Sequence, residues 1–71
     1  MELHELIKAI RLEMGLSQQQ LAKELLVSFA AVNRWENKRT KPNQIARHAF
    51  ISLAEKYNVN KDIIEAFKLS Q

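Results

Sequence analysis

The sequence GLSQQQLAKELLVSFAAVNRWENKRTKP, residues 15–42, contains two helix starts separated by a short turn. Ser17 followed by Gln20 is a capping box, in which each side chain bonds the backbone N–H group of the other residue. Ser28 is a second favoured helix start, because its hydroxyl accepts a bond from a free N–H group of the first turn. The predicted elements are a helix over 17–25, a turn around Leu26 and Val27, and a helix over 28–37. Two short helices joined in this way form a helix-turn-helix unit over about 17–37.

Outside this unit, apolar residues recur three or four positions apart, which is typical of one face of a helix. Gly15 stands where a left-handed cap ends a helix, and Asn58 to Asn60 interrupt the pattern again. Further helices are predicted over 2–14, 44–57 and 61–69. The residues expected to face the core from these three helices are Leu3, Leu6, Ile7, Ile10, Met14, Ile45, Ala49, Phe50, Leu53, Ile63, Ile64 and Phe67. The sequence therefore predicts an all-α fold.

The 71 residues allow one domain, over residues 1–71, with a formal net charge of +3. The chain contains no Cys, which excludes disulfides, thiol catalysis and Cys-ligated zinc. His4 and His48 stand far apart without acidic partners at metal-ligand spacing, and no Gly-rich phosphate loop is present. No apolar run approaches the ~20 residues that a membrane span needs. We therefore expect a binding domain that is not an enzyme and uses no metal or cofactor.

The helix predicted over 28–37 has two faces of different chemistry. Phe29, Ala30, Asn33 and Arg34 fall on one arc at helical spacing, whereas Ala31, Val32 and Trp35 fall on the other. Asn pairs well with adenine and Arg with guanine, and an apolar group can contact the thymine methyl. The polar arc therefore fits the major groove of DNA, although Asn and Arg also occur on ordinary solvated faces. Phe29 has an alternative of its own, partial burial against a neighbouring turn or helix.

Positive charge is concentrated at the end of this helix and just after it. Residues 34–48 carry five cations and one acid, a net charge of +4, whereas residues 1–33 have a net charge of −1. The cations are Arg34, Lys38, Arg39, Lys41 and Arg47. Cations placed beside a recognition helix can neutralise the phosphates that flank the groove. A solvated basic loop remains the alternative.

The stretch over 15–42 resembles the Cro/repressor-like (XRE-type) helix-turn-helix family. The similarity lies in Leu-Ser-Gln, Gln-Leu-Ala, Val-Ser, Val-x-x-Trp-Glu-Asn and a basic stretch that ends in Pro. The resemblance implies a compact four- to five-helix, lambda-repressor-like domain that binds double-stranded DNA. The DNA-binding residues that it and the charge pattern imply are Gln18, Ser28, Phe29, Ala30, Asn33, Arg34, Asn37, Lys38, Arg39 and Lys41.

The resemblance also assigns roles to particular residues. Gln18 would contact phosphate and brace the recognition helix, and Arg11 with Glu36 would form a structural ion pair. Two positions depart from the family pattern, because Leu26 and Lys38 stand where glycine is usual. A Leu with positive φ is strained, so we expect Leu26 either to alter the turn or to cost stability.

These features predict a sequence-specific transcriptional regulator that acts in the cytoplasm and is encoded by a bacterium or a phage. One alternative is an antitoxin that also binds a toxin, for which the last helix with its short end over 68–71 is the candidate surface. Another is a protein-interaction module that keeps the fold without binding DNA. A homodimer is a further possibility, in which the last helix either supplies the interface or closes the core, and we favour the core.

Overall fold

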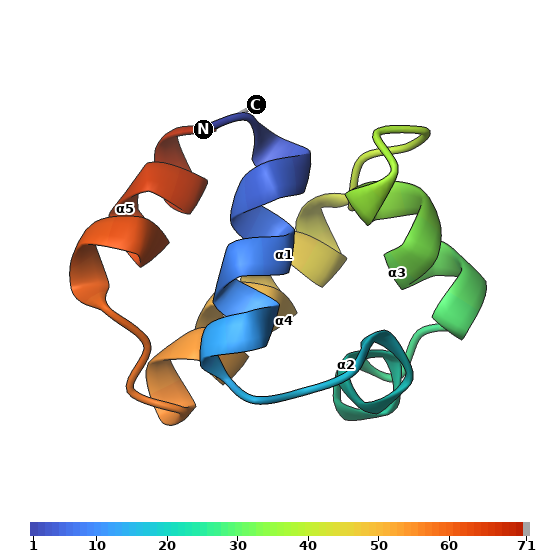
Figure 1. The fold of residues 1–71 in the computed structure, drawn as a ribbon, viewed down its shortest axis with the longest axis horizontal. Helices are drawn as coiled ribbons and strands as arrows, with labels where there is room; N and C mark the ends of the chain where they lie inside the picture. The colour runs from blue at the N-terminus through green and yellow to red at the C-terminus, as the bar shows by residue number, and fades with distance from the viewer. Residues whose placement is uncertain (71) are drawn as a thin grey trace.

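The computed structural model describes residues 1–70, which form five helices and no strand. The helices are α1 (Leu3–Glu13), α2 (Gln18–Leu25), α3 (Phe29–Glu36), α4 (Gln44–Lys56) and α5 (Lys61–Leu69). The predicted all-α class is confirmed, and every predicted boundary holds to within one residue. In Figure 1, α1 runs through the middle of the molecule, with α5 on one side, the α2–α3 pair on the other and α4 behind.

The helix starts are fixed by the local hydrogen bonds that the sequence predicts. The Ser17 hydroxyl accepts a bond of 3.0 Å from the Gln20 backbone N–H group, and the Gln20 side chain accepts one of 2.8 Å from the Ser17 N–H group. The Ser28 hydroxyl accepts from the Ala31 N–H group at 3.0 Å, and the Asn43 side chain caps α4 in the same way. Each bond satisfies a backbone donor that the helix itself leaves unpaired.

One apolar core joins the five helices. Helix α1 packs on α3 and α5, α2 packs on α3 and α4, and α4 packs on α5. The core residues are Leu6, Ile7, Ile10, Met14, Leu21, Ala22, Leu25, Val32, Trp35, Ala46, Phe50, Leu53, Ala54, Val59, Ile64 and Phe67. Ile64 and Phe67 of α5 are both in this set, and Ile63 packs against it. Helix α5 therefore closes the core, as we favoured.

The inward position predicted for Ile45 is wrong, because its side chain is 82% exposed. Ala46, Phe50 and Leu53 define the buried face of α4 instead. Phe50 is 2% exposed, and Ile45 lies five residues away, which is about 140° around the helix. Burial of the larger aromatic side chain sets the rotation of α4 and turns Ile45 out to solvent.

The end of α5 is attached to α4 by Arg47. One guanidinium nitrogen, Nη2, donates to the carbonyl oxygens of Phe67 at 3.0 Å and Ser70 at 2.9 Å. The guanidinium also lies over the Phe67 ring, 4.7 Å from its centre, and that ring packs edge-on against Phe50 at 5.0 Å. Arg47 thus adds a side-chain donor at the end of α5, to the Ser70 carbonyl and to the Phe67 carbonyl, which also accepts from the Ser70 N–H group at 3.1 Å.

Candidate nucleic-acid interface

Helix α3 has one buried and one exposed face. Val32 is fully buried and Trp35 is 7% exposed, and both belong to the core. Phe29, Ala30 and Arg34 are exposed, with Phe29 at 50%. The prediction of Trp35 as a core residue is confirmed. An apolar side chain at the first turn, a small one beside it and a guanidinium one turn further therefore remain open to a ligand.

The turn between α2 and α3 keeps the geometry that glycine usually provides. Leu26 adopts a left-handed backbone conformation, with φ 58° and ψ 41°. The N–H group of Val27 donates to the Ala22 carbonyl at 3.0 Å, which closes the end of α2. The Leu26 side chain is 92% exposed, so no burial offsets the strained backbone. Leu26 therefore leaves the turn unaltered and adopts the strained left-handed conformation itself.

A buried ion pair joins α1 to the end of α3. Arg11 Nε lies 2.6 Å from Glu36 Oε2, and Arg11 Nη2 donates to Glu36 Oε1 at 3.0 Å. The remaining Arg11 nitrogen, Nη1, donates to the Leu16 carbonyl at 2.9 Å. The two side chains are 9% and 4% exposed, so the paired geometry and the further bond to Leu16 offset the cost of removing both charges from water. The expected structural ion pair is confirmed.

A chain of amide side chains extends from this ion pair along α3. Gln18 Nε2 donates to Glu36 Oε1 at 2.9 Å, and Gln18 Oε1 accepts from Asn33 Nδ2 at 3.0 Å. Asn37 Nδ2 then donates to Asn33 Oδ1 at 3.1 Å and to the Asn33 carbonyl at 2.8 Å. Gln18 therefore connects the start of α2 with two positions of α3. This contact is the bracing role that the resemblance implies for Gln18.

Asn33 departs from the outward position that helical spacing predicts. Its side chain is half-buried, and both ends of its amide already have protein partners in Gln18 and Asn37. One N–H bond and one oxygen lone pair of the amide remain, because the group has two donors and two lone pairs. Hydrogen bonds to Gln18 and Asn37 therefore fix the Asn33 side chain but leave part of its hydrogen-bonding capacity free. Arg34, in contrast, is exposed.

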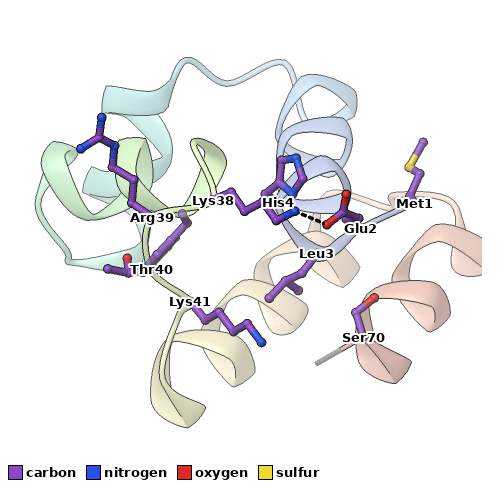
Figure 2. A pocket seen from close by; sticks show the side chains of 10 residues that line it. Met1, Glu2, Leu3, His4, Lys38, Arg39, Thr40, Lys41 and Ser70 are labelled. Carbon is purple, nitrogen blue, oxygen red and sulfur yellow. Dashed lines mark ion pairs between the residues drawn. The ribbon is translucent and has the colours of Figure 1, made fainter.

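Lys38 forms an ion pair with Glu2, a partner that spacing along the sequence does not predict. Lys38 Nζ lies 2.8 Å from Glu2 Oε1, just before α1 (Figure 2). The hydrogen bond and charge of Glu2 raise the pKa of Lys38, and Lys38 lowers the pKa of Glu2 in the same way. Both side chains are more than half exposed, so the pair is open to solvent. Lys38 itself has a φ of 62°, the left-handed conformation for which glycine is usual at this position.

The loop after α3 lines a hollow together with the start of α1 and Ser70. Arg39 and Lys41 are exposed, and neither forms an ion pair with another side chain within residues 1–70. In Figure 2, Arg39 extends away from the hollow, whereas Lys38 reaches across to Glu2. The loop therefore presents two cations whose charge is not compensated by a neighbouring acid.

Arg47 differs from the other cations of the basic segment. It is half-buried and its guanidinium is committed to the end of α5. Sequence spacing could not predict this role, because the partners of Arg47 are backbone carbonyls 20 and 23 residues away. Four exposed cations of the segment thus remain at the surface: Arg34, Lys38, Arg39 and Lys41.

Two helices joined by a tight turn, with the second exposed along one face and followed by a basic loop, define a DNA-binding helix-turn-helix domain. A model of the helix-turn-helix family matches residues 7–64. The chain therefore belongs to this family, the Cro/repressor-like (XRE-type) regulators, and is a DNA-binding helix-turn-helix protein. No match to a curated protein and no match to a solved structure was found.

Within residues 1–70, no group of three or more His, Asp or Glu side chains is placed to hold a metal ion. None of the helices in this range has both the length and the apolar character required to cross a membrane.

Proposed function

We propose that the protein is a sequence-specific regulator that binds double-stranded DNA with α3 in the major groove. The observation that carries the proposal is the open face of α3, which bears Phe29, Ala30 and Arg34 beside a loop with uncompensated cations. The opposite face of α3 is anchored by Val32 and Trp35. A short helix held in this way can enter a groove about 12 Å wide without rearranging the core.

The residues of α3 divide by the chemistry that they offer to base edges. Arg34 can donate two hydrogen bonds to O6 and N7 of a guanine, the commonest specific contact in the major groove. Ala30 permits close approach, and Phe29 offers an apolar surface to a thymine methyl group. The Ser28 hydroxyl accepts the cap bond and keeps its own proton as a donor.

A second group of residues would hold the DNA backbone. Arg39 and Lys41 carry the exposed charge of the loop, and Lys38 adds a third cation once it leaves Glu2. Gln18 keeps one free amide N–H bond beside its bond to Glu36, whereas Asn37 would have to give up one of its two bonds to Asn33 in order to donate to a phosphate. Contacts of this kind fix the position of the duplex and make binding strongly dependent on salt.

Selection of bound sites from random duplex DNA at about 150 mM salt tests the proposal. An enriched sequence would support it, and an enriched inverted repeat would further support a homodimer with half-sites about one helical turn apart. Arg34→Ala is the matched variant and is expected to lose enrichment at one base pair. If the folded protein enriches no sequence, the proposal is wrong, and the antitoxin and interaction-module hypotheses become the ones to test.

A salt titration separates DNA binding from a protein contact. Neutralisation of about five to seven phosphates predicts a loss of affinity of roughly 10³-fold or more between about 50 and 200 mM salt. Capture of a protein partner that is indifferent to salt, without duplex binding, would favour the interaction module. Residue 71, part of the segment suggested for a toxin contact, lies outside the described residues.

A further inference from the structure

We infer that Glu36 and Gln18 are positioning residues that fix the direction in which the Asn33 amide faces, so that Asn33 reads adenine. The inference rests on the proposed function, because it concerns a base contact made by α3. Its physical basis is the chain of hydrogen bonds from Glu36 through Gln18 to Asn33. Arg11 completes the arrangement by holding the Glu36 carboxylate in place.

The direction of the chain is set by the carboxylate at its buried end. An ionised carboxylate only accepts hydrogen bonds, so the Gln18 group that faces Glu36 has to be the NH₂ group. Gln18 then presents its oxygen to Asn33, so Asn33 has to donate from its own NH₂ group. Turning either amide over would place two acceptors or two donors against each other. Glu36 therefore determines the orientation of an amide that it does not touch.

The same orientation is supported from the other side of Asn33. Asn37 donates from Nδ2 to Asn33 Oδ1 at 3.1 Å, which matches an oxygen turned away from Gln18. The second bond of Asn37, to the Asn33 carbonyl at 2.8 Å, holds the donor where it is. Both ends of the Asn33 amide thus agree with the direction imposed by Glu36.

The base read by Asn33 follows from what the amide retains. One N–H bond and one oxygen lone pair are free, and adenine presents an acceptor at N7 and a donor at N6 in a fixed order. Only one of the two amide orientations matches that order in a given docking position. A fixed orientation therefore favours adenine, whereas a freely turning amide would discriminate less between bases.

A stability cycle tests the orientation without DNA. The variants are Asn33→Asp, Gln18→Met and the double variant, unfolded with urea at about pH 7.5, where Asp is ionised. If Glu36 fixes the orientation of Gln18, the carboxylate introduced by Asn33→Asp faces the Gln18 oxygen and is repelled by it. Asn33→Asp should then lower the urea midpoint more in the native background than in the Gln18→Met background. If Gln18 can turn, it donates to the new carboxylate and the order reverses.

The sign of the coupling between positions 18 and 33 shows whether the orientation of Gln18 is fixed, because both backgrounds keep Arg11 and Glu36. Repulsion between Glu36 and the new carboxylate is the same in each background and cancels in the cycle. A larger midpoint shift with Gln18 supports the inference. An equal shift, or a larger one with Met, overturns it.

Base preference is the second measurement, made by competition binding on the selected site and its single-base variants. We expect Gln18→Met and Asn33→Ala to lose discrimination at the same adenine-containing base pair, by about tenfold. Gln19→Met is the matched control, since Gln19 is exposed on α2 and its side chain forms no hydrogen bond within residues 1–70. It should leave preference unchanged.

The outcomes separate the inference from the proposed function. A folded Gln18→Met protein that keeps the full preference at the Asn33 base pair overturns the positioning role. A native protein without preference at any base pair overturns the proposed function itself. In that case the urea cycle still determines whether the amide orientation is fixed.

Discussion

Replacing Leu26 by glycine should stabilise the protein, because Leu26 holds a left-handed backbone conformation in the turn between α2 and α3. Its φ is 58° and its ψ is 41°. The left-handed conformation destabilises a residue that has a Cβ atom by about 1–2 kcal/mol, and it does not destabilise glycine in this way. The side chain is 92% exposed, so its removal sacrifices little apolar burial.

The gain is reduced by the freedom that glycine adds to the unfolded chain. This entropic cost is about 0.5–1 kcal/mol, which leaves a net stabilisation of about 0.5–1 kcal/mol. For a domain of this size, that difference raises the melting temperature by about 2–8 °C. The bond from the Val27 N–H group to Ala22 uses only backbone atoms and should persist.

Thermal and urea unfolding followed by circular dichroism measure the effect, with Leu26→Ala as the matched control. Alanine removes most of the exposed side chain but keeps the Cβ atom, so it should give little of the gain. Equal melting temperatures for Leu26→Gly and Leu26→Ala would refute the argument from backbone strain. Because α2 and α3 keep their relative orientation, DNA affinity of the glycine variant at a temperature where both proteins are folded should be unchanged.

Three other predictions concern the surface around α3. Arg34→Ala should cost about 1–3 kcal/mol of binding on the selected site and relax preference at one base pair, measured by competition binding; equal losses on all sequences would exclude a base contact. Glu2→Gln should free Lys38, whose pKa its partner raises, and steepen the salt dependence of DNA binding, whereas Lys38→Ala should lower it; the two changes should add up to about one unit, because one cation neutralises one phosphate. An unchanged slope in both variants would place Lys38 away from the phosphates. Arg47→Met should lower the free energy of unfolding by about 1.5–3 kcal/mol without altering that slope, and a shallower slope would show a phosphate contact instead.

The DNA-binding surface combines residues with two different kinds of support. Arg34, Arg39 and Lys41 are exposed and depend on the fold only for their position. Asn33 and Lys38 have partners in other parts of the chain, Gln18 and Glu2. Substitutions at these partners should therefore change DNA binding although the partners were not expected to read bases.

The Glu2–Lys38 pair also sets a direction for the effect of pH on its own contribution. The pKa of Glu2 is lowered in the folded protein, so the contribution of the pair is present above the ordinary pKa of a glutamate. It is lost as the pH falls through the lowered pKa. The pKa of Lys38 is raised, so on the alkaline side the contribution is lost as the pH rises through that raised pKa.

The helix-turn-helix unit could be predicted because its determinants are local. Ser17, Gln20, Ser28 and Asn43 each bond a backbone group or side chain three residues away, so the helix starts depend on short stretches of sequence. The buried positions of Val32 and Trp35 likewise follow from spacing along one helix. The Arg11–Glu36 pair came from the resemblance and spans much of the chain, so spacing alone would not have found it.

Contacts between distant residues decided the rest. Spacing along α4 predicted both Ile45 and Phe50 on the inner face, and burial of the larger ring against α5 left Ile45 in solvent. Arg47 appeared as one of several cations until its bonds to the end of α5 were known. Sequence by itself therefore determined where the helices begin and end and which face of α3 is apolar, because hydrogen bonds and side-chain spacing within a few residues are sufficient for both. Only the tertiary structure decided which polar side chains are held and which remain exposed, since that depends on partners brought together from different helices.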